Sequence, residues 1–136
     1  MSEANQKTIE AVYAAFGRGD LPFILERTSE HTAWDFSVAA PEVPWHTPVR
    51  SRAELPRFFQ AMADHVAFEA FEPRAFVTDG RNVVVKLRVA YQVKRTGRRV
   101  DEEQVQWWSF DDAGRIVSLR HYEDTASVRD AWTPPA

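Results

Sequence analysis

The sequence predicts an α+β fold in one domain, residues 1–136, with helices in the first half and an antiparallel sheet in the second. Three observations predict it. Apolar residues recur at helical spacing before residue 66, alternating runs of strand length follow after it, and short turn sequences separate these runs. Short connections between consecutive strands favour an antiparallel meander, so we expect a curved, mostly antiparallel sheet.

The first 38 residues should form two helices and a strand. Asp20 is placed to cap the second, short helix, and residues 31–38 have the pattern of a strand. The first helix is indicated by an apolar face at the i, i+3, i+4 and i+7 spacing: Ile9, Val12, Tyr13 and Phe16.

A proline-rich loop over residues 39–50 should separate this strand from a third helix. Trp45 and His46 lie in that loop and could cover the mouth of a cavity. Ser51 and Glu54 have the spacing of a capping box, and the helix that follows should end near His65.

Four strands are expected after the third helix, over about 67–78, 83–94, 99–110 and 115–123, and Asp124 can cap a last helix over 125–132. A two-residue turn at Thr96-Gly97 would place Leu87 opposite Gln106, and a four-residue turn at 111–114 would place Gln104 opposite His121. The inward face is then apolar except for embedded polar side chains: Glu102, Gln104, Gln106, His121 and Glu123.

The opposite face of this sheet carries Trp107, Val105, Ile116 and Tyr122. Such a face is too apolar to be left in water, so we expect a homodimer formed through the outer sheet face.

The composition excludes several classes of protein. Lys and Arg number 17 against 20 Asp and Glu, and this net charge of -3 gives no basic excess for binding nucleic acid. Cysteine is absent, which excludes disulfides, thiol catalysis and Cys-ligated metals. No run is long and apolar enough for a membrane span, and the first residues do not look like a secretory signal, so a cytoplasmic location is expected.

Four segments share a family pattern: Tyr13-Ala-Ala-Phe16-Gly-Arg-Gly-Asp20-Leu, the strand with Trp34-Asp35-Phe36, the capped helix with Phe58-Phe59, and the ending Asp112-Ala-Gly114-Arg-Ile116-Val-Ser-Leu-Arg120-His-Tyr122-Glu-Asp124-Thr. Over roughly residues 5–132, the chain resembles the SnoaL-like branch of the nuclear-transport-factor-2 superfamily. That superfamily includes ketosteroid isomerase, polyketide cyclases and limonene-epoxide hydrolase. The resemblance implies a cone-shaped half-barrel around one apolar cavity, and commonly a dimer.

The resemblance does not carry over a known set of catalytic residues. Val12, Phe36 and Gln106 stand where ketosteroid isomerase has its tyrosine, its general base and its protonated acid, so that mechanism is not implied. Against limonene-epoxide hydrolase, His121 falls at the position of one catalytic aspartate.

His121 is the predicted acid or base, because an imidazole in an apolar cavity can exchange protons near neutral pH. Gln104 could orient it or bind a substrate carbonyl, and Gln106 could donate to a developing oxyanion. The alternative is a core histidine whose hydrogen bonds are satisfied by Gln104 and a carboxylate. The expected contacts with an apolar ligand are Trp34, Phe36, Phe76, Tyr91, Glu102, Trp108 and Leu119.

Two hypotheses for function follow. The chain is a cofactor-independent isomerase, cyclase, hydrolase or dehydratase acting on an apolar cyclic or carbonyl compound. Alternatively, it binds an apolar ligand without chemistry or serves as a dimeric interaction domain. The histidines lack metal-ligand spacing and the chain has no GxGxxG, Walker A or GxSxG motif, so neither a metal nor a cofactor is expected.

Overall fold

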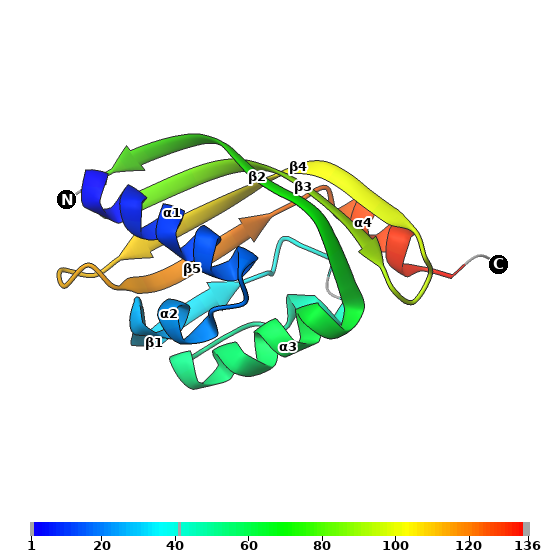
Figure 1. Cartoon of the computed structure of the whole chain (residues 1–136), viewed down its shortest axis with the longest axis horizontal. Coiled ribbons are helices and arrows are strands. Elements are labelled where there is room, and N and C mark those ends of the chain that lie inside the picture. The colour runs from blue at the N-terminus through cyan, green and yellow to red at the C-terminus, as the bar shows by residue number, and fades with distance from the viewer. Residues whose placement is uncertain (1, 41, 135–136) are drawn as a thin grey trace.

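Five strands form one curved sheet around helices α1 and α3 in the computed structural model, which describes residues 2–40 and 42–134 (Figure 1). Helices α1 to α3 precede strands β2 to β5, and the α+β prediction is confirmed. The elements are α1 (Ser2–Gly17), α2 (Leu21–Glu26), β1 (Thr28–Asp35), the 3-10 helices η1 (Pro44–His46) and η2 (Arg52–Glu54), α3 (Leu55–His65), β2 (Val66–Asp79), β3 (Asn82–Val93), β4 (Arg99–Phe110), β5 (Ile116–Tyr122) and α4 (Thr125–Trp132).

The strand order is β1-β5-β4-β3-β2. Strands β2 to β5 pair as consecutive antiparallel neighbours, whereas β1 pairs in parallel with β5 at the sheet edge. The parallel pair sets Trp34 beside Leu119, so the aromatic end of β1 lies next to the strand that carries His121.

Helix starts follow the expected capping chemistry at two of three places. The Asp20 carboxylate accepts from the Phe23 N–H at 3.2 Å, and Asp124 caps α4 in the same way. The prediction of a capping box before α3 is wrong. The Ser51 side chain makes no cap bond, and Glu54 instead accepts from the Arg50 N–H at 2.7 Å, ahead of a 3-10 turn.

The β3–β4 turn is longer than expected, and this shifts the register. The Val93 N–H donates to Arg98 O and the Gly97 N–H donates to Val93 O, each at 2.8 Å, so four residues make the turn. The β4–β5 pairing is displaced by two residues independently of that turn, and Gln106, rather than Gln104, lies opposite His121. Because the displacement is two residues and side chains alternate with a period of two, Gln104 and His121 still face inward and are buried.

A β-bulge between Ser109 and Phe110 corrects one assignment on the outer face. The bulge pairs Phe110 with Ile116, so Ile116 turns into the core and is fully buried. Trp107 does lie on the outer face and is 45% exposed. The homodimer that this face suggests stays a prediction.

The concave face of the sheet packs against α1 and α3 and forms most of the core. Val83, Val85 and Leu87 of β3 are fully buried there. No helix formed by residues 2–40 or 42–134 has both the length and the apolar composition needed to cross a membrane.

Candidate functional site

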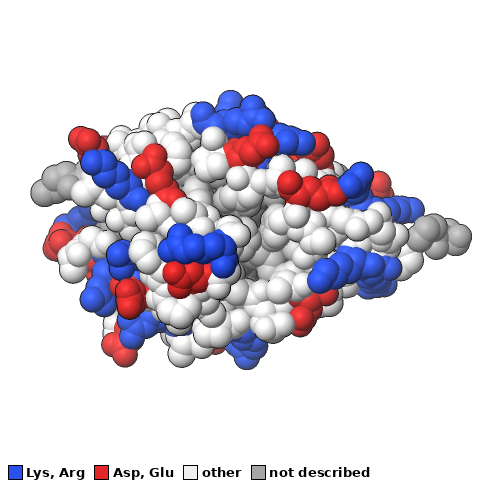
Figure 2. Space-filling view, in the orientation of Figure 1, with Lys and Arg blue, Asp and Glu red and all other residues white. Residues whose placement is uncertain are grey.

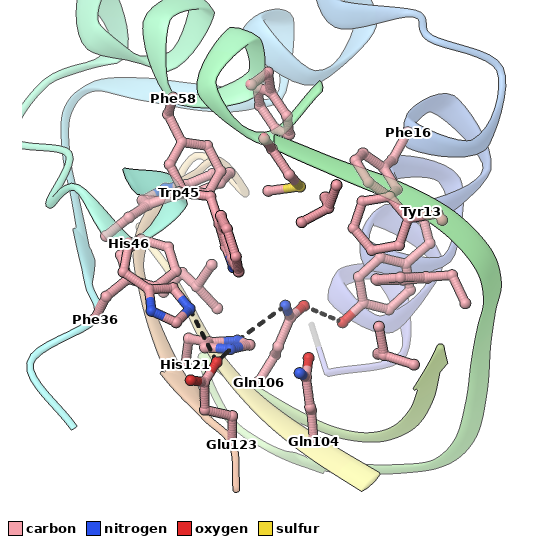
Figure 3. Close-up of a pocket in the computed structure, with 18 of the residues that line it drawn as sticks. Tyr13, Phe16, Phe36, Trp45, His46, Phe58, Gln104, Gln106, His121 and Glu123 are labelled. Carbon is pink, nitrogen blue, oxygen red and sulfur yellow. Dashed lines mark hydrogen bonds and ion pairs between the residues drawn. The ribbon is translucent and has the colours of Figure 1, made fainter. Parts of the chain in front are cut away.

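A cavity of about 80 Å³ lies between the concave face of the sheet, α1, α3 and the loop before η2. Its walls are mainly aromatic (Figure 3). Predicted contacts that line it are Trp34, Phe36, Tyr91, Gln104, Gln106, Trp108, Leu119 and His121. Phe76 and Glu102 do not line it: Phe76 packs on the core further along β2, and Glu102 accepts from Gln104 and from the Asp124 N–H.

Glu123, His121 and His46 form a buried triad at one end of this cavity (Figure 3). Glu123 Oε1 lies 2.9 Å from His121 Nε2 and 2.9 Å from His46 Nε2. The other carboxylate oxygen accepts from the Ala40 N–H at 3.3 Å. The side chains of Glu123, His46 and His121 are 1%, 2% and 8% exposed, so these contacts form away from bulk water.

The loop from β1 to η1 delivers His46 to the triad. Backbone hydrogen bonds between Trp34 and Val49, in both directions, fold the loop back beside β1. Within it, His46 Nδ1 lies 2.7 Å from Ala40 O, and the ring stacks on Phe36 with centroids 5.6 Å apart. These contacts leave Nε2 facing Glu123.

A line of hydrogen bonds leads from α1 to the triad across the cavity floor (Figure 3). The Trp108 Nε1–H donates to Tyr13 Oη at 3.1 Å, and Tyr13 Oη–H donates to Gln106 Oε1 at 2.8 Å. The amide nitrogen of Gln106 then faces His121 Nδ1 at 3.5 Å. Since an indole nitrogen can only donate, this order leaves Nδ1 as the acceptor and places the His121 proton on Nε2.

Burial and hydrogen bonding set the charge state of the site. Burial alone would raise the pKa of Glu123, but the hydrogen bonds from His121 and His46 outweigh it and lower the pKa to about 2. Burial lowers the pKa of His121, although the contact with Glu123 opposes this. Burial raises the pKa of both Tyr13 and Tyr91, so each keeps its phenolic proton.

Two buried side-chain oxygens of the described residues lack a hydrogen-bond partner, Tyr91 Oη and Glu102 Oε1. Burying such a group without a partner is costly. Tyr91 lines the cavity, so its hydroxyl is available to a bound molecule.

The triad is also a group of residues that could hold a metal ion. Its three ligand atoms lie within 4.8 Å of one another. The two distances to Glu123 Oε1 of 2.9 Å are hydrogen-bond distances. The expectation of no metal stays a prediction.

A wider hollow, here called the vestibule, adjoins the cavity between α1, α2, α3 and β2, with a volume of about 810 Å³. Figure 2 shows a largely uncharged hollow in the middle of this face, with charged side chains around it. The vestibule and the cavity share walls: Tyr13, Phe16, Ile24, Phe59, Met62, Val66, Phe68 and Phe71.

Sequence reasoning did not place Tyr13 or His46 in the site. The periodicity of the first helix assigns Tyr13 to the core, and the loop position assigns His46 to a lid. The contact between His46 and Glu123 depends on the path of an irregular loop, for which the sequence carries no periodic signal. Glu123 was recognisable by its position two residues after His121 on the inward face.

Comparisons with known proteins agree on the fold. A family model described as SnoaL-like domain matches residues 9–119. An NTF2-like protein from Burkholderia xenovorans LB400 has a TM-score of 0.87 and 26% identity over 98% of each chain. An NTF2-like protein of unknown function from Burkholderia pseudomallei K96243 also reaches 0.87 with 26% identity, over 98% of this chain and 99% of that chain.

A third solved structure, TerC co-crystallised with polyporic acid, has a TM-score of 0.83 at 21% identity. The match covers 94% of this chain and 97% of TerC, and at that identity it supports the fold alone. The search of curated proteins found no match.

Proposed function

Because the chain belongs to the SnoaL-like family, we propose that it is a cofactor-independent enzyme that moves a proton on an apolar, carbonyl-containing small molecule. The observation that carries this proposal is the hydrogen-bonded line Tyr13–Gln106–His121–Glu123 on the floor of a cavity with mostly apolar walls. A carboxylate that orients an imidazole, whose other nitrogen faces a cavity, is a general arrangement for acid–base catalysis.

His121 is the general base in this proposal. Its Nε2–H donates to Glu123 at 2.9 Å, which orients the ring and stabilises the imidazolium that forms. Its Nδ1 is contacted by the Gln106 amide at 3.5 Å, a long and weak contact that a substrate can replace. The lowered pKa of His121 keeps the ring in the form that accepts a proton.

The reaction begins when His121 Nδ1 takes a proton from the carbon next to the substrate carbonyl. The electron pair of that C–H bond forms a carbon–carbon double bond while the π electron pair of the carbonyl moves to its oxygen, and the carboxamide N–H groups of Gln104 or Gln106 donate to the resulting enolate. Where the substrate has a β,γ carbon–carbon double bond, the enolate is conjugated with it, and return of the same proton at the γ carbon gives isomerisation. Attack of the enolate carbon on a second carbonyl of the same molecule gives cyclisation, after which the imidazolium protonates the new alkoxide.

The substrate would place its polar end in the cavity and its remainder in the vestibule. A dry cavity of about 150 Å³ accommodates benzene, so a cavity of about 80 Å³ takes only the reacting end of a ring system. The apolar walls shared with the vestibule suit an uncharged, mostly hydrocarbon remainder. TerC, a protein of similar fold, was co-crystallised with an organic molecule, polyporic acid.

Ligand binding without chemistry is the second candidate. It is favoured by His121, whose two nitrogens already have protein partners, and by Tyr91, whose buried hydroxyl has none among the described residues. Under this candidate, Tyr91 anchors the ligand and His121 is a satisfied core residue.

Proton exchange in D₂O distinguishes the two candidates. The probes are β,γ-unsaturated cyclic ketones and 1-indanone, and NMR records loss of the α-proton signal. We expect wild-type protein to accelerate exchange and His121→Gln to lose about 10²–10⁴-fold of that acceleration. His65→Gln is the matched control, because His65 contacts Trp45 and Trp132 rather than Glu123. The enzyme proposal would be contradicted if the ketones stabilise wild type, His121→Gln and His65→Gln but all three proteins leave α-proton exchange at the uncatalysed rate. That result would support the second candidate.

A further inference from the structure

His46 faces oxygen atoms at both ring nitrogens. Nδ1 lies 2.7 Å from Ala40 O, and Nε2 lies 2.9 Å from Glu123 Oε1. A backbone carbonyl and a carboxylate can only accept, and a neutral imidazole has a single N–H. Both contacts are hydrogen bonds only when His46 carries two ring protons and a positive charge.

His121 faces one acceptor and one donor. Nε2 lies 2.9 Å from Glu123 Oε1, while Nδ1 lies 3.5 Å from the Gln106 amide nitrogen. The donor-only indole of Trp108 sets the direction of the line through Tyr13, so Gln106 cannot turn its oxygen to His121 without losing the bond from Tyr13. His121 therefore carries one proton, on Nε2.

The charges in this part of the core favour the same distribution. The two imidazole centroids are 5.7 Å apart and share a single carboxylate. Two imidazolium rings at this distance would repel each other in a site that water does not reach. One charged ring beside the Glu123 carboxylate leaves the triad neutral, and the burial of an unpaired charge is avoided.

We propose that His46 is a positioning residue for the general base: it carries the single positive charge of the triad, pairs with Glu123, and so holds His121 neutral with Nδ1 unprotonated. This inference rests on the proposed function for its catalytic meaning, but the protonation pattern stands on the contacts alone. The role belongs to the loop that carries His46, which the family resemblance did not mark.

Other ionisable groups near the triad are compatible with this pattern. Glu42 lies on the same loop and pairs with Arg129 on α4 at 2.6 Å. Glu102 and Asp124 lie beyond Glu123, where the Asp124 N–H and Gln104 donate to the Glu102 carboxylate. Tyr13 and Tyr91 complete the surroundings as neutral phenols.

The test is the protonation of each imidazole nitrogen, measured by long-range ¹H–¹⁵N NMR on the full chain. In wild-type protein near neutral pH, we expect N–H signals from both nitrogens of His46 and from Nε2 alone of His121. A neutral His46, or a His121 protonated at both nitrogens, would overturn the proposal without any substitution being needed.

His46→Gln tests the charge itself, because glutamine keeps hydrogen-bonding groups but is neutral. At 5.7 Å, Coulomb's law with an effective dielectric constant between about 80 and 20 predicts that the His121 titration midpoint rises by about 0.5–2 pH units. His65→Gln should leave the midpoint in place. An unchanged midpoint in folded His46→Gln protein would refute the role of His46.

The two proposals fail separately. If the NMR pattern is as expected but His121→Gln retains full exchange activity, only the proposed enzyme function is wrong. If His121→Gln abolishes exchange while His46 is neutral, only the role of His46 is wrong.

Discussion

Replacement of Glu123 by glutamine should remove a defined part of the acid sensitivity of this fold. The pKa of Glu123 falls from its ordinary 4.5 to about 2 in the folded protein, and the side chain is 1% exposed. Each pH unit of such a difference corresponds to 1.36 kcal/mol. The ionised carboxylate therefore contributes about 3 kcal/mol to the free energy of unfolding at neutral pH.

The sign follows from proton binding. Between pH of about 4.5 and 2 the unfolded chain binds the Glu123 proton and the folded chain does not, so stability falls as the pH is lowered through this window. Above the window the full contribution is present. A domain with an ordinary stability of about 5–15 kcal/mol should stay folded after the loss of about 3 kcal/mol.

The assay is urea unfolding at a series of pH values for wild type, Glu123→Gln and Glu103→Gln. We expect the free energy of unfolding of the wild type to exceed that of Glu123→Gln by about 3 kcal/mol near neutral pH, and this difference to shrink toward low pH. Exposed carboxylates with lowered pKa values, such as Asp35 and Asp101, are present in both proteins and cancel in the difference. Glu103, an exposed residue 3.7 Å from Lys86, should behave as wild type. A Glu123→Gln protein with the wild-type pH dependence would refute this reasoning.

Three further predictions concern the cavity, the outer face and metals. Tyr91→Phe removes a buried hydroxyl that has no partner among the described residues, so the stability of the ligand-free protein should change by less than about 1 kcal/mol. The variant should also bind cyclic ketones more weakly. Thermal unfolding measures the stability and calorimetry the binding, and a large loss of stability would contradict the prediction. Trp107→Glu places a charge on the outer sheet face, where Trp107 is 45% exposed. We expect this substitution to convert a dimer to monomers, as measured by sedimentation velocity. A wild-type protein that is monomeric at micromolar concentration would refute the dimer. Treatment with EDTA should change neither the melting temperature nor the His121 spectrum, and one tightly bound ion per chain by elemental analysis would contradict this.

The inward face of the sheet was predictable because its determinant is local. Alternation with a period of two assigns Gln104, Gln106 and His121 to one face, and an error of two residues in register leaves that assignment intact. The identity of the residue that contacts His121 depends more strongly on the register. The same error exchanges Gln106 for Gln104 beside His121, which changes the chemistry of the site.

Irregular backbone accounts for what the sequence did not predict. The bulge at Phe110 turns Ile116 from the expected outer face into the core, and no residue pattern announces it. His46 reaches Glu123 from 77 positions away along the chain through a loop held by Val49 and Ala40. Such contacts depend on the path of the whole chain, so side-chain spacing alone cannot identify them.

The most direct test of the account is a crystal structure of the protein soaked with a cyclic ketone that stabilises the protein against thermal unfolding. The account predicts that the carbonyl enters the cavity, that the adjacent carbon lies within about 3.5 Å of His121 Nδ1, and that the Gln106 amide turns to the ligand. A ketone confined to the vestibule, with the Gln106–His121 contact unbroken, would contradict it.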